Sequence, residues 1–451
     1  MIAMFFPFEL ADGVALLIVT LLAVAVTWMV SRRNGQDERR LFALSLAMHL
    51  VFSQLLLYLQ STIYTDSDAW GYRSDSMVLY RLLEVDPGKY VPEVLAIIFR
   101  LKSELMEGVG QSSTMSMVAL VALGRFVTFD SYWALYAISA CASFFGKWAI
   151  YAVFRDELQH VRRRILAVAT MCVPSVVFWT SGVVKEAYAV AGLGALCYGM
   201  CRLFRVRAVG VIWAFIGATF VGIFKPYVLF PFAVGAMGWL VFERSKSVRA
   251  HAPIYFLVGV IGGIGLVIAL SALFPQFSPT NIAEQTALQQ FHGASAGGGS
   301  VYSIQTGDGG VTGQLAAAPL ALLTVLARPF PWEAKGVPTM IASIEMTILT
   351  FLLLWALLKG RFSAIGAAFL MPPVLFSVMF ILVGGIAIGL ATTNFGTLSR
   401  YRVPIMPFYA VLVVHLSQHT AAAARSLKER GPKARSKTGA MVQTAGSPRA
   451  S

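Results

Sequence analysis

The arginines and lysines of this chain are concentrated in every second connection between its long apolar runs. A helix needs about 17–25 apolar residues to cross a bilayer. Runs of this kind begin near Gly13, Leu41, Tyr132, Ile165, Ala187, Ala208, Pro226, Pro253, Val337, Ala364 and Val403. Basic clusters follow the first, third, fifth, seventh, ninth and last runs. Because cytoplasmic loops retain the excess of positive charge, this alternation predicts about eleven transmembrane helices, with the N-terminus outside and the C-terminus in the cytoplasm.

The composition excludes an ordinary soluble protein. Hydrophobic residues make up 57% of the chain and charged residues 13%, and the mean hydropathy is +0.70. Soluble globular proteins rarely contain so many long apolar stretches. The net charge of +14 comes mainly from the predicted inner loops and from the tail after Ala424, where basic residues meet anionic lipid headgroups. We therefore expect membrane lipid, and no nucleic acid, as a partner.

The cysteines and the N-terminus give no sign of a secreted protein. Cys141, Cys172, Cys197 and Cys201 fall inside apolar runs or at their inner ends, so they predict buried thiols and no disulfide framework. The first residues lack the basic segment of a cleaved signal peptide. We expect the first apolar run to remain as a membrane anchor.

We expect an all-α polytopic membrane protein in five parts. They are residues 1–40 (an N-terminal transmembrane helix and a basic inner loop), 41–274 (a transmembrane core with an outer loop at 61–131), 275–336 (an outer loop with a re-entrant segment), 337–420 (C-terminal transmembrane helices) and 421–451 (a disordered basic cytoplasmic tail). Within the first outer loop, apolar residues at helical spacing in Ser76–Leu83 and Val91–Leu105 predict two interfacial helices, with a turn at Asp86-Pro87-Gly88.

The first group of candidate site residues begins this outer loop. Asp66 and Asp68 lie two residues apart, so they can bind a divalent cation such as Mg²⁺ or Mn²⁺ together with a substrate phosphate. Alternatively, one carboxylate can deprotonate an attacking hydroxyl. Trp70 and Tyr72 suit stacking on a sugar, or anchoring in the membrane interface. The plain alternative is a solvated acidic loop.

Two lysines mark neighbouring outer turns. Lys185 and Glu186 stand at the start of an apolar helix, where a lysine is costly unless it meets an anion. Lys225 repeats this arrangement at the next outer turn. The backbone N–H groups of a helix start favour phosphate. A structural Lys–Glu pair, with the lysines as interface anchors, is the alternative.

The second half of the chain adds arginines. Arg328, Trp332 and Glu333 belong to a turn framed by prolines, and arginine suits bidentate phosphate binding. Arg400 and Arg402 lie on the predicted outer side, against the charge bias, which predicts an anion nearby. Contact with lipid headgroups is the alternative.

These motifs resemble the GT-C superfamily of integral-membrane glycosyltransferases and the related exopolysaccharide and O-antigen polymerase-like proteins of bacterial envelopes. The resemblance depends on Thr65–Asp68, Ser181–Glu186, Arg328–Glu333 and Arg400–Pro407, and on the two predicted interfacial helices. It covers most of Leu41–Gln418, with residues 41–274 as the GT-C-like core. One departure is the additional apolar run before the first acidic loop.

The resemblance implies an activity and roles for the site residues. Asp66 or Asp68 would act as a base or a metal contact, and Lys185, Arg328, Arg400 and Arg402 would hold the phosphate of a polyprenyl-phosphate-linked sugar donor. A growing glycan or a lipid would be the acceptor. The location implied is the bacterial cytoplasmic (inner) membrane, with the active site facing the periplasm.

Two rival functions remain open at this point. A transporter or flippase for lipid-linked oligosaccharide would need charged residues in its spans; Lys147 and Glu345 are the candidates, both expected near the ends of spans. A ligase-like enzyme without metal would use the arginines and His292 as an acid–base group. The sugar, the linkage and the oligomeric state stay open.

Overall fold

The computed structural model of the protein describes residues 8–63, 67–106, 112–244, 310–360, 362–369 and 371–420, together with positions 280, 281, 284, 286–288, 290, 291, 301, 302, 304 and 306. Asp66, His292, the apolar run from Pro253 and the tail 421–451 lie outside the described residues. Among the residues described, the one extended pairing is an isolated antiparallel bridge between Val301 and Asn394. The prediction of an all-α chain is confirmed for this part of the protein.

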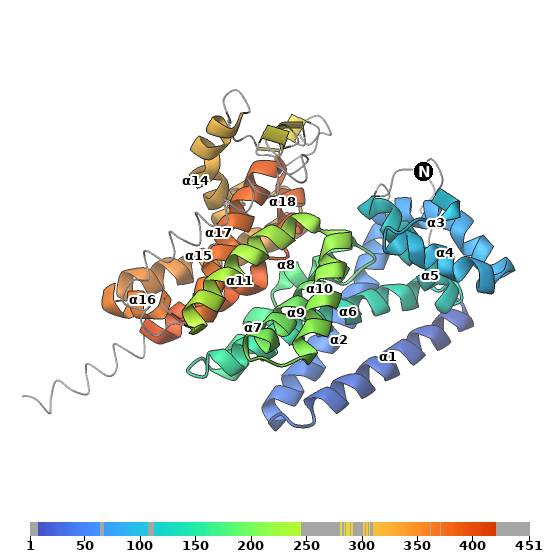
Figure 1. Ribbon diagram of the computed structural model, residues 1–451, viewed down its shortest axis with the longest axis horizontal. Coiled ribbons are helices and arrows are strands. Elements are labelled where there is room, and N and C mark those ends of the chain that lie inside the picture. Colours follow the sequence, from blue (N-terminus) through green and yellow to red (C-terminus); the bar gives the residue numbers. More distant parts are fainter. Residues whose placement is uncertain are drawn as a thin grey trace, which may run out of the picture.

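The helices follow one another along the colour bar of Figure 1. They are α1 (Leu10–Ser31), α2 (Gln36–Thr62), α3 (Asp68–Val85), α4 (Pro87–Ile98), α5 (Ser113–Val127), α6 (Tyr132–Glu157), α7 (Arg163–Met171), α8 (Pro174–Thr180), α9 (Lys185–Phe204), α10 (Val209–Phe224), α11 (Leu229–Arg244), α14 (Val311–Ala327), α15 (Val337–Lys359), α16 (Phe362–Phe369), α17 (Pro372–Ala391), α18 (Phe395–Tyr401) and an unlabelled helix at 406–420. Short 3₁₀ turns lie at η1 (Glu104–Met106), η2 (Pro226–Val228) and η5 (Pro331–Glu333).

The structure supports a multi-pass membrane protein. Within the described part of the chain, seven helices are long and apolar enough to cross a bilayer, or eight if α7 and α8 form one bent span. Of the remaining predicted runs, α10 has 16 residues, the run from Pro253 lies outside the described residues, and the last corresponds to helix 406–420. The total of eleven stays a prediction.

Prolines interrupt two of the predicted runs. The run from Ile165 is divided into α7 and α8, which meet at 45°, and Pro174 stands in the first turn of α8. The run expected from Ala364 is divided into α16 and α17, so the long helix begins at Pro372 instead. A proline has no N–H to donate and restricts the residue before it, so a helix ends there. The predicted start of this span was wrong for that reason.

The segment predicted as the first outer loop folds into three helices at one end of the bundle (Figure 1). Helices are present at both predicted positions: α3 includes the predicted Ser76–Leu83, whereas α4 begins at Pro87 and ends at Ile98, short of the predicted Leu105. Asp86 caps α4 by accepting from the backbone N–H of Lys89 at 3.1 Å. Their interfacial position stays a prediction. The third helix, α5, was not predicted. It packs against α3 and α4 through buried side chains that include Leu83, Val94 and Met117.

A buried arginine holds this end together. Arg125 of α5 is fully buried, and its Nε donates to Asp130 at 2.6 Å. Its Nη1 donates to Ser76 at 3.2 Å. The guanidinium also lies over the ring of Tyr80, 4.5 Å from the centroid, and 5.6 Å from that of Tyr132. These contacts join α3, α5 and α6.

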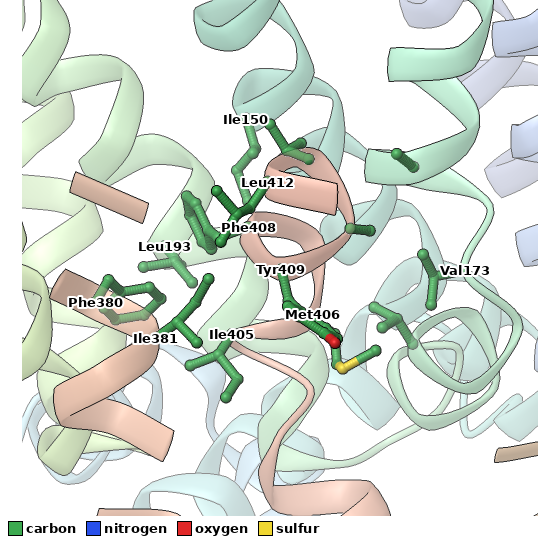
Figure 2. Packing of buried hydrophobic residues seen from close by; sticks show 14 of the residues in the cluster. Ile150, Val173, Leu193, Phe380, Ile381, Ile405, Met406, Phe408, Tyr409 and Leu412 are labelled. Carbon is green, nitrogen blue, oxygen red and sulfur yellow. The ribbon is translucent and has the colours of Figure 1, made fainter. Parts of the chain in front are cut away.

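Helix 406–420 passes through the centre of the other half of the bundle. Figure 2 shows its side chains filling the space between the helices that carry Ile150, Leu193 and Phe380. The Phe408 ring meets those of Phe380 and Phe154 with centroids 5.0 and 5.8 Å apart. An aromatic core of this kind fixes the position of the helix and of the residues just before it.

The pair α6 and α9 packs at backbone contact. A Cβ built on Gly194 would lie 2.0 Å from the Gly146 carbonyl oxygen, and one built on Gly146 would lie 2.5 Å from the Val190 carbonyl oxygen. Small residues permit such close approach between helices in a membrane, where packing replaces the hydrophobic effect as the main attraction.

We predict that Arg125→Ala lowers the stability of the protein by about 3 kcal/mol, because it leaves Asp130 and Ser76 without their buried partner. The measurement is the melting temperature of the purified protein in detergent. Arg81→Ala is the matched control: its ion pair with Glu84 is exposed and is expected to contribute less than about 0.5 kcal/mol. Equal melting temperatures for the two variants would contradict the structural role of Arg125.

Candidate functional site

A fully buried carboxylate lies at the centre of the candidate site. Glu186 is the second residue of α9 and is fully buried. Its Oε1 accepts from Lys225 Nζ and from Arg400 Nε, both at 2.8 Å. The positive end of the helix dipole also favours a carboxylate there. Glu186 thus brings together three segments that are distant in the sequence.

Arg400 extends this cluster to the start of α3. Its Nη1 lies 2.6 Å from Asp68 Oδ2, and Asp68 is the first residue of α3. The Arg400 side chain is mostly buried, whereas that of Asp68 is about half exposed. One guanidinium therefore connects a buried carboxylate to a carboxylate that solvent reaches.

The two cations of the cluster are held in their charged forms. Burial alone lowers the pKa of Lys225, but the Glu186 carboxylate outweighs burial, so this pKa lies above the usual lysine value. Burial likewise lowers the pKa of Arg400, and Glu186 and Asp68 together outweigh it, so the pKa is raised. Both groups carry a positive charge at neutral pH.

Lys185 faces a different set of groups from those expected. Its Nζ donates to Thr114 Oγ1 at 2.9 Å and to Ser113 Oγ at 3.1 Å, and it lies 5.9 Å from the centroid of the Tyr72 ring. Among the described residues, Glu186 therefore pairs with Lys225 and not with the neighbouring Lys185, which points toward the start of α5.

A cavity of about 430 Å³ opens beside Asp68 and Arg400. Its lining combines these two charges and a few other polar groups with an apolar wall. The lining residues are Leu56, Gln60, Ile63, Ser67, Asp68, Ala69, Phe178, Trp179, Val184 and Arg400. A ligand with one charged end and one apolar part matches such a cavity.

The proline-framed turn forms a second group of contacts. Arg328 Nε donates to Glu333 Oε1 at 3.0 Å, and its guanidinium lies 4.9 Å from the centroid of the Phe395 ring and 5.3 Å from that of Tyr302. Glu333 also accepts from the backbone N–H of Phe330 at 2.8 Å. The turn is thus locked around one ion pair.

An aromatic pair stands beside this turn. The ring of Trp332 stacks on that of Phe330, with centroids 4.9 Å apart and planes 18° apart. Trp332 is 81% exposed, so one face of this pair is open to a partner molecule or to lipid.

The Arg402 side chain contacts the backbone of Arg328 and is not exposed. It is fully buried, and its Nη1 donates to the carbonyl oxygen of Arg328 at 2.7 Å. Its Nε and Nη2 have no hydrogen-bond partner among the described residues. This geometry makes Arg402 a positioning residue for the backbone of the turn.

A short helix joins the two groups. Arg400 lies on α18 and Arg402 just after its end. Two residues turn a helix by about 200°, so the two side chains point to opposite sides, one toward Asp68 and the other toward Arg328. The acidic motif and the proline-framed turn, predicted from distant parts of the sequence, therefore contact opposite sides of the α18 segment.

The aromatic candidates of the first loop are tied into the fold. Trp70 Nε1 donates to the Gln60 carbonyl oxygen at 2.6 Å, and the Arg73 guanidinium lies 5.2 Å from the Trp70 ring centroid. Tyr72 is buried. These contacts join α2 to α3 and leave little ring surface for a sugar.

The predicted metal contact concerns Asp66 and Asp68, of which only Asp68 is described. Asp68 is paired with a guanidinium. Among the residues described, no group of three or more His, Cys, Asp or Glu side chains has a metal-binding arrangement. The described donor set alone does not fit a divalent cation, so a metal here would depend on Asp66.

Sequence reasoning missed several neighbours of the cluster. Tyr401 lies over Lys225, with Nζ 4.3 Å from the ring centroid, and Tyr136 donates to Gln60 Oε1 at 2.5 Å. The hydroxyl oxygens of Ser113 and Thr114 accept hydrogen bonds from Lys185 Nζ. Of these, only Tyr401 carried a signal, because it stands between the two arginines predicted to lie on the outer side.

No protein-family model matches the chain, and neither a curated protein nor a solved structure is significantly similar to it. A function for the protein is therefore argued from the geometry of the site.

We predict that Glu333→Gln removes an acid-sensitive contribution to stability. Burial raises the pKa of Glu333, but hydrogen bonds from Arg328 and from the Phe330 amide outweigh it, so the pKa is lowered. A lowered pKa stabilises the folded state above the unfolded glutamate pKa of about 4.3, and this contribution is lost as the pH falls through the lower folded value.

The melting temperature of the wild type should therefore exceed that of Glu333→Gln at neutral pH, and the gap should close below about pH 4. Glu104→Gln, at an exposed position, is the control and should keep the wild-type profile. A gap that is constant from pH 7 to pH 3 would show that the ion pair is not the cause.

Proposed function

We propose that the protein is a membrane glycosyltransferase or polymerase. It would transfer a sugar from a polyprenyl-(di)phosphate-linked donor on the outer, periplasmic face of the bacterial cytoplasmic membrane during envelope polysaccharide synthesis. The observation that supports this proposal best is the pairing of Asp68 with Arg400 at 2.6 Å on the wall of a cavity that has both polar and apolar lining. A carboxylate, a guanidinium and an apolar surface are the three features that a lipid-linked phosphosugar requires.

The charge of the cluster favours an anionic ligand. Lys225 and Arg400 pair with Glu186 and Asp68, and the nearby Lys185 adds one net positive charge to this part of the protein. Glu186 is fully enclosed and neutralises Lys225. Arg400 is the cation that reaches the cavity, so a donor phosphate would bind there, where a low dielectric strengthens the contact.

Binding of phosphate would free the base. The donor phosphate would take the place of Asp68 on Arg400, and the released carboxylate would accept the proton of the acceptor hydroxyl. The acceptor oxygen would then attack the anomeric carbon while the bond from that carbon to the phosphate oxygen breaks. The leaving phosphate would keep the bonding electron pair and remain on the guanidinium, which stabilises its charge.

The remaining residues receive supporting roles in this proposal. Phe178 and Trp179 line the cavity and would contact the first isoprene units. Arg328, held by Glu333 and by Arg402, would be a second anion contact on the other side of α18. The exposed face of Trp332 would stack on an acceptor sugar. A divalent cation held by Asp66 and Asp68 remains part of the proposal, tested by the effect of EDTA on transfer.

One set of contacts favours transport of a lipid-linked oligosaccharide as the second candidate function. Lys147 is fully buried and donates to Thr180 at 2.8 Å, while Glu345 accepts from the backbone N–H and hydroxyl of Ser175 at 2.8 and 2.7 Å. Both partners lie on α8, half of a bent pair, and transporters place charges beside broken helices. Lys147 lies well inside α6 and Glu345 well inside α15, so the expectation that both lie near the ends of spans was wrong.

We predict that Asp68→Asn lowers sugar transfer by about 10²–10⁴-fold, as expected for loss of a general base. The measurement is surface polysaccharide and lipid-linked donor in cells that carry only the variant, at equal protein level in the membrane. Asp75→Asn, also on α3 and exposed, is the control. Donor retained in the outer leaflet supports an enzyme, donor retained in the inner leaflet supports a transporter, and unchanged polysaccharide removes Asp68 from either mechanism.

We also predict that the two halves of the site are reached from the same side of the membrane. Cysteines placed at Ser74 and Trp332, both exposed, should react with an impermeant maleimide on intact spheroplasts. A cysteine at the exposed Arg207 should react only after permeabilisation. The native cysteines are buried or half-buried, which keeps the background low. Labelling of positions 74 and 332 from opposite sides would exclude a shared site.

A further inference from the structure

Gln60 lies on the wall of the cavity beside Asp68 and Arg400 and has no part in the proposed transfer step. It belongs to the last turn of α2 and is only 5% exposed. A buried side-chain amide normally forms hydrogen bonds through both its oxygen and its nitrogen. The contacts of these two atoms therefore decide what Gln60 can offer to a ligand.

Both oxygen atoms of Gln60 are already engaged. The side-chain Oε1 accepts from the hydroxyl of Tyr136 at 2.5 Å, which fixes the orientation of the amide. The backbone carbonyl oxygen accepts from Trp70 Nε1 at 2.6 Å, which ties the end of α2 to α3. The amide nitrogen, Nε2, has no hydrogen-bond partner among the described residues. Its two N–H groups are therefore what Gln60 leaves for the cavity.

Two further groups of donors open on the same cavity. Arg400 uses Nε and Nη1 for Glu186 and Asp68, which leaves the two N–H groups of its Nη2. The start of α3 also lines the cavity, and Ser67, which precedes this helix, does not cap it through its side chain. The first N–H groups of a helix have no partner within the helix and favour phosphate. The wall thus presents donors from α2, α3 and α18.

We propose that Gln60 is a phosphate-binding residue of this cavity, and that its amide N–H groups donate to the oxygens of the phosphate held by Arg400. This inference deepens the proposed function, since it rests on the same phosphate contact. An N–H group that meets an anionic oxygen forms a charge-assisted hydrogen bond. Because the amide is neutral, this contact avoids the cost of burying another charge.

The orientation of the amide favours phosphate over a sugar hydroxyl. An ionised phosphate oxygen only accepts hydrogen bonds, whereas a hydroxyl both donates and accepts. With Oε1 occupied by Tyr136, the Gln60 side chain offers donors alone. Phe178 and Trp179, on the apolar part of the same wall, suit the hydrocarbon chain of a phosphate ester. Inorganic phosphate would share the contact with Gln60 but not the contact with this apolar part.

The test is the affinity of the full-length protein in detergent for farnesyl phosphate, measured by isothermal titration calorimetry, with farnesol and inorganic phosphate as reference ligands. We expect Gln60→Leu to weaken binding of farnesyl phosphate by about 10–100-fold, the range for one hydrogen bond to a charged group, and to leave binding of farnesol unchanged. Gln60→Glu keeps an oxygen for Tyr136 and replaces the donor by a negative charge, so it should weaken farnesyl phosphate at least as much.

Gln54→Leu is the matched control. Gln54 lies on the same helix, but its Nε2 donates to Ser53 Oγ at 2.8 Å and to the Trp133 carbonyl oxygen at 3.3 Å. This variant should therefore bind farnesyl phosphate as the wild type does. The melting temperature of each variant shows whether it is folded.

Equal affinity for farnesyl phosphate in the wild type and in a folded Gln60→Leu variant would overturn the inference. So would a folded Gln60→Glu variant that binds as tightly as the wild type, because a carboxylate accepts from a hydroxyl but cannot donate to a phosphate. Absence of binding of both phosphate ligands to the wild type would overturn it as well.

The failure of this inference and that of the proposed function can be told apart. Inorganic phosphate that binds as tightly as farnesyl phosphate, and loses affinity in Gln60→Leu, would support the phosphate contact and remove the lipid-linked donor. Binding of farnesyl phosphate that depends on Gln60, together with unchanged polysaccharide in Asp68→Asn cells, would support the binding site and remove the proposed base.

Discussion

The enclosed carboxylate of Glu186 is the interaction on which the arrangement of the site depends. An isolated charge in the interior of a membrane protein is costly, and here Lys225 and Arg400 offset it at 2.8 Å each. This requirement brings the turn after α10 and the α18 segment to the start of α9. Loss of one partner would leave the others buried and unpaired, which costs more than the pair contributes on its own.

The same requirement explains how α18 acts as a junction. Arg400 is fixed on one side by Glu186 and Asp68, and Arg402 on the other by the backbone of the Arg328 turn. The helix that follows is held by the aromatic contacts of Phe408. The charged residues are therefore positioned by an apolar core that begins a few residues after them.

Part of this architecture can be read from the sequence and part cannot. Apolar length and helical spacing predict most of the long helices and both α3 and α4, because these signals are local. The ion pair between Glu186 and Arg400 joins residues 214 positions apart, and no local pattern specifies such a pair. No feature of the sequence distinguishes Arg402 from Arg400 in a way that predicts the burial of Arg402. Asp66 and His292 lie outside the described residues, so their predicted roles remain predictions.

The glycine contact between α6 and α9 has a consequence for how the two ends of the molecule communicate. With backbone against backbone at Gly146 and Gly194, the two helices have no layer of side chains between them that could deform and absorb a displacement. We expect the two helices to move as one rigid unit, with Glu186 near one end and the loop after Glu157 near the other. A displacement at either end would then tilt the whole helix pair and so move its other end.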